Sequence, residues 1–405
     1  MQAQEAAPHR ATTFKLPDLG DTRTAFAHKT NGELRQGWWL FRVIGTPWLT
    51  SLGGNLTKAA LALHLPVKGL VKATIFKQFC GGETIGESLA TAEALAKSGV
   101  GTILDYSVEG EGDSKAMDST AAEILRTIEA AKGNPHIPFS VFKPSGIIPR
   151  EVLEKVAAGK ALDADGEKEW AHARQRVQQI CQAAYDADVP VLIDAEESWT
   201  QGPVDALTTE MMRRFNGKRA IVYGTVQLYR HDRLAFLRKE LEKARAEGYH
   251  VGMKLVRGAY MEKERERAAK MGYPDPIGAN KQAVDKDYDD ALRFCMENID
   301  RMGVLNGTHN EKSSLLLAEL MHKAGLPNND PRIHFGQLLG MSDNISFNMA
   351  AAGYNVVKYV PYGPVAKVLP YLIRRAEENT SARGQTGREL AMITAERQRR
   401  SKASA

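Results

Sequence analysis

Polar and ionisable residues recur in this sequence where short apolar segments end. The segment PFSVFK ends in Lys143, PVLID ends in Asp194, and HVGMKLV carries Lys254 near its end. The other polar residues in such places are Gln227, Thr308, His309, Asn310 and Tyr359. Lysines beside carboxylates and a phenol can stabilise a developing negative charge, move protons, or form a Schiff base through the lysine amine.

A second group of candidate residues lies near the carboxyl terminus. Tyr371 precedes Arg374 and Arg375 by three and four positions, and Arg374 precedes Glu378 by four. On a helix this spacing puts the side chains on one face. Adjacent arginines can bind a carboxylate through bidentate hydrogen bonds. A solvated basic face is the alternative, and this helix by itself favours it.

These residues need elements that bring them together, and the apolar pattern supplies eight of them. The expected strands are 101–106, 138–143, 190–194, 220–226, 250–256, 303–308, 332–337 and 355–360. The expected helices are 119–132, 166–187, 205–216, 232–247, 281–301, 312–324 and 364–379. This alternation predicts an α/β fold, a closed TIM-like (β/α)8 barrel over residues 71–380. Because barrel active sites form at the carboxyl ends of the strands, the polar residues should meet at one mouth, with the last helix over it.

An open dinucleotide-binding sheet is the alternative fold. It requires the pattern GxGxxG between its first strand and first helix. The nearest stretches, 99–104 and 110–115, lack the third glycine, and no P-loop occurs. A nucleotide cofactor is therefore expected to bind in some other way.

The two ends of the chain are expected to lie outside the barrel. Residues 1–70 predict an N-terminal arm with helical pieces at 23–46 and 57–64, packed onto the rest through the cluster Trp38-Trp39-Leu40-Phe41. Residues 381–405 predict a basic C-terminal tail. Six basic and two acidic residues in 380–405 leave +4 of the chain's +5 there. We favour a disordered solubilising end; attachment to anionic lipid, at about 1 kcal/mol per basic residue, is the other hypothesis.

Composition limits the classes of protein. The 405 residues are 43% hydrophobic and 25% charged, which is typical of a globular protein and excludes disordered and fibrous chains. No apolar segment approaches the ~20 residues of a membrane-spanning helix, and no secretory signal is expected. Cys80, Cys181 and Cys295 are far apart and indicate a reducing compartment. The run at 262–267 alternates in sign, so it indicates a solvated helix face and no nucleic-acid partner.

The residues alone leave several activities open. A Schiff-base aldolase would use Lys143 and would need no paired arginines. A metal-dependent hydrolase is less favoured because no HExxH occurs and His309 is the one histidine at an expected strand end, so no metal site is predicted. A non-catalytic scaffold or membrane-binding protein is the third class.

Five segments resemble the proline dehydrogenase family, the FAD-dependent barrel enzymes that begin proline catabolism. They are IDAEESW (193–199), KLVRGAY (254–260), GTHN (307–310), FGQLLGM (335–341) and YVPYGPVAKVLPYLIRRAEEN (359–379). The resemblance covers residues 100–380 and, more weakly, the arm from about 20. It points to the monofunctional subtype, since the chain has no room for an aldehyde dehydrogenase module.

The resemblance implies a role for each motif residue around the substrate. Arg374 and Arg375 would bind the substrate carboxylate, and Glu378 would hold the two guanidinium groups in place. Lys143 would lie beside both the substrate and the flavin. The residues that would line the substrate pocket are Tyr359, Tyr371 and Leu339.

The resemblance also implies an FAD site. Asp194 and Lys254 would lie near the reactive edge of the flavin and, with Lys143, form the catalytic set; Gln227 would hydrogen-bond the ring. The residues that would contact the rest of FAD are Arg257, Gly258, Ala259, Tyr260, Thr308, His309 and Asn310. Many bacterial relatives carry Arg where this chain has Lys254, and lysine keeps the charge but loses the planar fork.

The implied reaction is hydride transfer from L-proline to FAD, giving 1-pyrroline-5-carboxylate. Cations stabilise the negative charge that the flavin receives, and the arginines and Lys143 should lower the pKa of the substrate amine. Tyr359 should exclude a ring hydroxyl, which favours proline over hydroxyproline. The family implies a membrane quinone as electron acceptor and a separate pyrroline-5-carboxylate dehydrogenase as possible partner. The expected location is the cytoplasm or the periphery of the inner membrane, on the matrix side in a mitochondrion.

Overall fold

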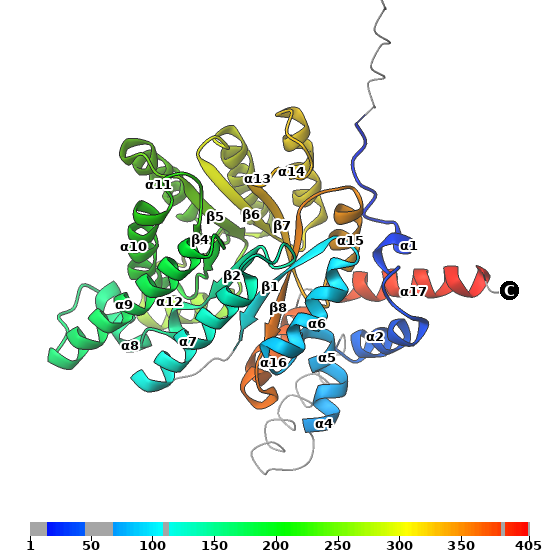
Figure 1. The fold of residues 1–405 in the computed structure, drawn as a ribbon, viewed down its shortest axis with the longest axis horizontal. Coiled ribbons are helices and arrows are strands. Elements are labelled where there is room, and N and C mark those ends of the chain that lie inside the picture. The colour runs from blue at the N-terminus through cyan, green and yellow to red at the C-terminus, as the bar shows by residue number, and fades with distance from the viewer. Residues whose placement is uncertain (1–13, 45–67, 108–112, 382–384, 404–405) are drawn as a thin grey trace, which may run out of the picture.

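A parallel barrel of eight strands forms the centre of the molecule (Figure 1). The structure is a computed structural model that describes residues 14–44, 68–107, 113–381 and 385–403. The strands are β1 (Val100–Tyr106), β2 (Phe139–Phe142), β3 (Val191–Ile193), β4 (Val222–Gln227), β5 (Val251–Val256), β6 (Met302–Gly307), β7 (Ile333–Leu338) and β8 (Val356–Tyr362). They pair in chain order, and β8 closes on β1. The predicted barrel and all eight predicted strands are confirmed.

The barrel interior explains why these segments are strands. Ile103, Val141, Leu192 and Leu305 point inward and pack with the rings of Phe139, Tyr223 and Tyr359. The opposite side chains of the same strands pack under the surrounding helices. Strands buried on both faces must be apolar along their whole length, and this is the pattern that the sequence shows.

Helices surround the barrel and connect its strands. Around the barrel they are α6 (Ile85–Ala96), α7 (Ser114–Ala131), α8 (Arg150–Ala157), α9 (Ala164–Asp186), α10 (Ser198–Phe215), α11 (Arg233–Glu247), α12 (Met261–Met271), α13 (Lys281–Glu297), α14 (Glu311–Lys323), α15 (Asp343–Ala351) and α16 (Val365–Ser381). The predicted helices are confirmed, although α10 begins earlier because it tolerates Pro203 within it. α6, α8 and α15 were not among them. The run at 262–267 lies in α12 and most of its residues are exposed, as expected, although Glu264 is buried and accepts from Ser198.

The N-terminal arm is helical, but its first predicted helix is broken in two. α1 (Thr22–Ala25) ends before α2 (Asn31–Ile44) begins. The break occurs because Thr30 and Glu33 form a capping box: the Thr30 N–H donates to the Glu33 carboxylate at 2.9 Å, and the Glu33 N–H donates to the Thr30 hydroxyl at 3.2 Å. Two short elements follow, α4 (Lys68–Val71) and α5 (Lys77–Phe79), joined by a π-helical turn. The predicted helix at 57–64 lies outside the described residues.

The aromatic cluster of the arm packs as expected only in part. Phe41 is buried, with its ring edge-on to Phe79 at 6.3 Å between centroids. Trp38 donates through Nε1 to the Thr394 hydroxyl at 3.0 Å, whereas Trp39 is exposed. The arm therefore packs largely against the C-terminal segment, and not only against the barrel.

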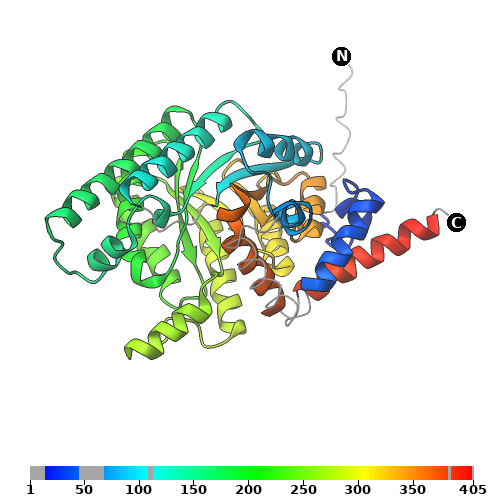
Figure 2. The same cartoon turned by 90° about the horizontal axis from the view of Figure 1, so that it is seen from below.

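The C-terminal segment is a helix, α17 (Gln385–Ala403), and the expectation of a disordered end was wrong. α17 lies alongside α2 in both views of the fold (Figures 1 and 2). Glu396 is fully buried and pairs with Arg399 and Arg400 at 2.7 Å each, and Arg400 also donates to the Phe26 carbonyl at 2.8 Å. Composition suggested a solvated tail because it counted these charges without their partners.

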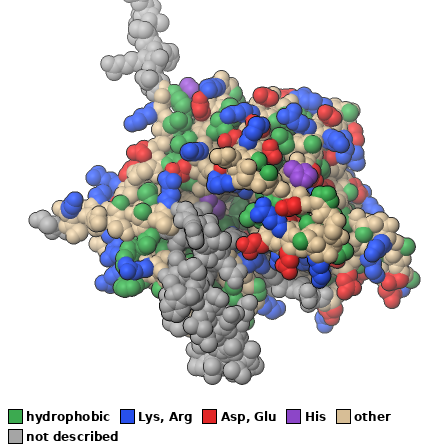
Figure 3. Space-filling model, turned by 180° about the vertical axis from the view of Figure 1, so that it is seen from behind, with side chains coloured by type: hydrophobic (Ala, Val, Ile, Leu, Met, Phe, Trp, Pro, Cys, Tyr) green, Lys and Arg blue, Asp and Glu red, His purple; other side chains and the backbone are tan. Residues whose placement is uncertain are grey.

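The basic character of this end of the molecule remains visible on its surface. Lys and Arg side chains gather where α17 projects from the body, on the left in Figure 3. Among the described residues, none of the helices is both long enough and apolar enough to span a membrane.

A second acidic residue of α17 should make the stability of the protein depend on pH in an unusual way. Glu389 is buried, and this burial raises the pKa of its carboxyl to about 7, aided by Asp343 and opposed by the Ser342 N–H, Lys358 and Lys29. A folded-state pKa above the ordinary 4.5 means that stability from this group is complete below pH 4.5 and is lost as pH rises through 7. We therefore expect Glu389→Gln to gain about 1–3 kcal/mol in unfolding free energy relative to wild type between pH 5 and pH 8.

Urea unfolding at the two pH values measures this difference. Glu396→Gln is the control, because hydrogen bonds from Arg399, Arg400 and Thr22 outweigh burial and lower the pKa of Glu396 to about 2. A Glu389→Gln variant whose stability relative to wild type is the same at pH 5 and pH 8 would contradict the expectation.

Candidate active site

The predicted site residues do meet at the carboxyl end of the barrel. Lys143 directly follows β2, Asp194 directly follows β3, and Thr308 directly follows β6. Gln227 ends β4, and Lys254 and Tyr359 lie within β5 and β8. Parallel strands in one closed sheet present their ends on the same side, and the geometry below shows which of these side chains touch.

One cluster joins strands from opposite parts of the sequence. Lys254 is buried, donates to the Asp194 carboxylate, and donates to the Tyr359 hydroxyl at 2.9 Å. Its ammonium group also lies 4.8 Å from the centre of the Tyr359 ring. A carboxylate and a phenol thus both hydrogen-bond this buried ammonium group. The cluster therefore offers a fixed positive charge beside a tyrosine.

A second lysine–carboxylate pair includes a residue that the sequence analysis did not select. Lys143 donates to both carboxylate oxygens of Asp105, at 3.1 and 3.2 Å. Asp105 lies near the end of β1, is buried, and also accepts from the Ser107 hydroxyl at 2.7 Å. The signal that could have found it is its place at the end of a predicted strand, the criterion that selected Asp194.

The two pairs flank Tyr359. Burial raises the pKa of the Tyr359 hydroxyl well above its ordinary value, and the carboxylates of Asp194 and Asp105 raise it further. The phenol therefore stays protonated. Since each lysine has its own carboxylate, the two pairs together are nearly neutral.

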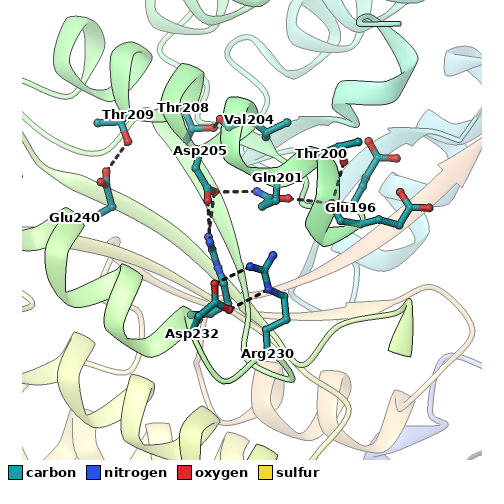
Figure 4. Close-up of polar contacts among 12 residues, drawn as sticks. Glu196, Thr200, Gln201, Val204, Asp205, Thr208, Thr209, Arg230, Asp232 and Glu240 are labelled. Carbon is teal, nitrogen blue, oxygen red and sulfur yellow. Dashed lines mark hydrogen bonds and ion pairs between the residues drawn. The ribbon is translucent and has the colours of Figure 1, made fainter. Parts of the chain in front are cut away.

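A chain of hydrogen bonds holds the segment that follows β3 (Figure 4). The Glu196 N–H donates to the Gln201 side chain at 3.3 Å, and Gln201 donates to Asp205 at 2.9 Å. Asp205 also accepts two hydrogen bonds from Arg233, at 2.8 and 3.0 Å. On the other side, the Glu196 carboxylate accepts from the Ser145 N–H at 2.9 Å, next to the β2 end. These bonds connect the turn after β2, α10 and α11 to the segment that carries Asp194.

The loop after β5 carries an arginine with three partners. Arg257 donates to Asp285 at 2.8 Å, to the Thr308 hydroxyl at 2.9 Å and to the Ser313 hydroxyl at 3.0 Å. Its guanidinium carbon lies 4.2 Å from the centre of the Tyr288 ring. Arg257 and Thr308, predicted to share a ligand, therefore do lie together. Asp285 and Ser313 come from α13 and α14, and nothing in their sequence context marked them.

Adding a single methyl group to the glycine after Arg257 should lower the stability of the protein. Gly258 has φ +127°, and a Cβ there would lie 2.4 Å from a ring carbon of the buried Tyr229. We expect Gly258→Ala to lower the unfolding free energy by about 2–4 kcal/mol through strain and overpacking. Gly272→Ala is the matched control: its φ is +73°, and a Cβ there meets nothing within 4 Å, so about 1 kcal/mol is expected. Equal losses in urea unfolding would rule out the ring contact as the cause.

The last barrel helix, α16, brings two of its four predicted residues into the interior. Tyr371 and Arg375 are buried, and the Arg375 guanidinium lies 5.2 Å from the centre of the Tyr371 ring. Arg374 is half-buried. The Glu378 side chain lies outside the described residues. An exposed basic face, which the helix alone favoured, does not describe Arg375.

His309 lies at the barrel mouth, two residues after the end of β6. Its Nδ1 lies 2.9 Å from the Ser342 hydroxyl. Burial lowers the pKa of His309 to about 3, with further lowering by Lys358 and Arg375. The ring is therefore neutral at physiological pH and can both donate and accept a hydrogen bond.

The remaining predicted residues are spread around the mouth. Gln227 is buried, and Leu339 is half-buried with its N–H donating to the Tyr359 carbonyl at 2.8 Å. Ala259 is exposed, and Tyr260 lies beneath the Lys263 ammonium, 5.5 Å from its ring centre. Asn310 caps α14 by accepting from the Ser313 N–H. These residues share one end of the barrel.

The donor set fits an anionic cofactor better than a metal ion. Within the described residues there is no group of three or more His, Cys, Asp and Glu side chains that could hold a metal. Arg257 and Thr308 present guanidinium and hydroxyl groups suited to a phosphate. Lys254 and Lys143 present cations deeper in the barrel. These residues fit a flavin dinucleotide in charge and hydrogen-bonding type.

Comparison with known proteins assigns the chain to a family. A family model described as proline dehydrogenase matches residues 88–388, most of the chain. The chain belongs to the proline dehydrogenase family. Family membership makes it an oxidoreductase of proline catabolism, as the sequence motifs indicated.

One similar protein carries the proline dehydrogenase name, and another is named for a different pathway. A protein named proline dehydrogenase 1, mitochondrial, from Dictyostelium discoideum is 33% identical over 97% of this chain and 76% of its own length. A protein named for carbapenem antibiotic biosynthesis, CarD, from Pectobacterium carotovorum is 36% identical over 80% of this chain and 83% of its own length.

A solved structure shares the proline dehydrogenase fold. The crystal structure of proline utilization A from Bdellovibrio bacteriovorus, inactivated by N-propargylglycine, superposes with a TM-score of 0.67 at 18% identity. The match covers 90% of this chain but 37% of that one, so this chain spans little more than a third of its length. At this identity the likeness supports the barrel fold alone.

Proposed function

We propose that this proline dehydrogenase oxidises L-proline to 1-pyrroline-5-carboxylate with FAD as cofactor. The observation that carries the proposal is the arrangement around Tyr359. Two lysines, each paired with a carboxylate, flank this tyrosine, and the family motif with Arg375 lies on the helix that follows its strand.

The substrate would be bound through its carboxylate. Arg375 is buried and Arg374 half-buried, so their guanidinium groups can form strong hydrogen bonds to a carboxylate away from bulk water. Tyr371 and Tyr359 would form apolar walls for the ring, with Leu339 nearby. Glu378 would hold the arginines in place.

The lysine pairs would act on charge and orientation. FAD, when bound, supplies the hydride acceptor for the carbon next to the substrate amine. Lys254, held by Asp194, would offset the negative charge that arrives with the hydride. Lys143, held by Asp105, would contact the substrate and the flavin. No protein nucleophile is needed for this step.

The substrate amine must be neutral when the hydride leaves. Arg374, Arg375 and Lys143 would disfavour a further positive charge beside them and so lower the pKa of that amine.

Residues at the outer part of the mouth would hold the remainder of FAD. Arg257 and Thr308 share a hydrogen bond and would contact its phosphates and ribose. The other residues proposed to contact FAD are Gln227, Gly258, Ala259, Tyr260, His309 and Asn310.

The absorption spectrum of the purified protein, before and after anaerobic proline, tests the proposal. We expect a yellow protein whose flavin absorbance bleaches on addition of L-proline. Colour that survives proline would indicate a flavoprotein of another specificity. A colourless protein that cannot take up FAD would favour the Schiff-base alternative, although that chemistry requires a neutral lysine and both site lysines are ion-paired.

Three finer features are also proposed. The buried Tyr359 would exclude a hydroxyl on the far ring carbon, so proline should be preferred to hydroxyproline. A membrane quinone would accept the electrons, and a separate pyrroline-5-carboxylate dehydrogenase would use the product. The basic face of α17 would support peripheral binding to an anionic membrane.

A further inference from the structure

The loop between β7 and α15, residues 339–342, is held by both ends of the chain. It contains Leu339 and ends at Ser342, which contacts His309. The sequence did not predict which residues hold this loop in place. The structure shows three.

The first support comes from α17. Ser342 has φ +51°, a left-handed conformation that non-glycine residues rarely adopt. In this conformation its N–H donates to the carboxylate of Glu389, and its hydroxyl lies 2.9 Å from His309 Nδ1. One residue thus connects a helix at the end of the chain to a histidine at the barrel mouth.

The second support comes from β8 and the N-terminal arm. Lys358 is completely buried and donates to the Met341 carbonyl at 2.5 Å and to Asp343 at 2.9 Å. Lys29 binds the other oxygen of Asp343 at 2.6 Å. Both lysines lie close to Glu389, since each lowers its pKa. The charges on this side of the loop are therefore balanced by residues from three elements.

The third support comes from α5. The Gln78 side chain donates to the Gly340 carbonyl at 3.0 Å. Gly340 has φ +76°, and a Cβ there would lie 2.1 Å from the Gln78 carbonyl oxygen. The loop has no room to shift toward the arm. The carbonyl of the strained Ser342 accepts from the N–H groups of Ile345 and Ser346 at 3.0 and 3.1 Å, and its own N–H is bonded to Glu389.

We propose that Glu389 is a positioning residue for the cofactor site, acting through Ser342 on His309. The inference rests on the proposed function, in which His309 contacts FAD. Glu389 accepts the Ser342 N–H and so holds Ser342 in its left-handed conformation. The Ser342 hydroxyl then fixes the His309 ring. Without the acceptor, Ser342 relaxes toward common backbone angles and its hydroxyl moves away from Nδ1.

Four single variants of the full chain test this chain of contacts. Glu389→Ala removes the acceptor, Glu389→Gln keeps an acceptor oxygen without the charge, and Ser342→Ala removes only the hydroxyl. Glu396→Ala is the matched control, because Glu396 is an equally buried carboxylate of α17 whose partners are Thr22, Arg399 and Arg400. The readouts are the FAD Kd of apoprotein by flavin fluorescence and the His309 ring ¹⁵N resonances, assigned by their loss in His309→Gln.

We expect Glu389→Ala and Ser342→Ala each to raise the FAD Kd at least fivefold and to shift the His309 resonances. Glu389→Gln and Glu396→Ala should stay within twofold of wild type. The double variant Glu389→Ala/Ser342→Ala should bind no more than twofold more weakly than the worse single variant, since both act through one contact.

Unshifted His309 resonances in Glu389→Ala would overturn the proposal, as would equal effects of Glu389→Ala and Glu396→Ala. Failure of Glu389→Gln to restore the wild-type resonances would also overturn it. If Glu389→Ala does not fold, Ser342→Ala and Glu389→Gln still test the positioning role. A wild-type protein that binds no FAD would refute the proposed function, and the His309 resonances would then decide the positioning role alone.

Discussion

Replacing Arg375 by methionine is expected to raise the proline KM about 100-fold or more while FAD remains bound. Arg375 is buried against Tyr371, so its bonds to a substrate carboxylate form where water competes poorly. Removing one partner of such a charge-assisted contact costs about 2–5 kcal/mol, and each 1.4 kcal/mol is a factor of ten. Methionine keeps most of the side-chain volume. Steady-state kinetics with proline, and the flavin content of the purified variant, measure the two parts of the expectation.

Lys367→Met is a suitable control for the Arg375 experiment. Lys367 lies in the same helix but is exposed, so its loss changes the net charge equally without touching the pocket. An Arg375→Met variant that saturates with proline at the wild-type concentration would refute the carboxylate assignment. Loss of FAD together with proline binding would instead assign Arg375 to the cofactor site through His309.

Lys254→Met is expected to lower kcat/KM by about 100- to 1,000-fold. The change removes the buried cation proposed to offset the transferred charge, an effect of about 3–4 kcal/mol for one preorganised group. It also leaves the Asp194 carboxylate without this partner, and the Tyr359 hydroxyl loses its donor at 2.9 Å. Stopped-flow measurement of flavin bleaching by proline isolates the hydride-transfer step from later oxidation.

Lys254→Arg is the comparison for Lys254→Met, because it introduces the residue that many bacterial relatives carry at this position. Arginine keeps the charge and adds a planar fork, so we expect a loss of less than tenfold. If the methionine and arginine variants bleach at the same rate, charge at this position does not contribute. Thermal unfolding of both variants shows whether a slower rate reflects loss of the cation or loss of the folded site.

The strand-end criterion accounts for the success and for the main omission of the sequence analysis. It selected Lys143, Asp194 and Lys254 because a closed parallel sheet must gather its strand ends. The same criterion applied to the first strand would have selected Asp105, the partner of Lys143. Pairings could not be predicted, because Lys254 and Tyr359 are 105 positions apart and meet only when β8 closes on β1.

The errors at the two ends of the chain have different causes. The break before α2 follows from a local signal, the capping box of Thr30 and Glu33, whose T-x-x-E pattern is present in the sequence. The docking of α17 on α2 follows from no local signal. Its charged residues look solvated until Glu396 is buried among Arg399, Arg400 and Thr22.

The sequence by itself determined the barrel, the order of its strands and the motif residues that identify the family, since apolar periodicity and short motifs are local properties of a chain. Only the tertiary structure decided which charges are paired, that Arg375 is buried, and that Glu389 reaches Ser342. Ion pairs and burial depend on distances between residues far apart in the chain. A sequence fixes these distances only through the complete packed fold.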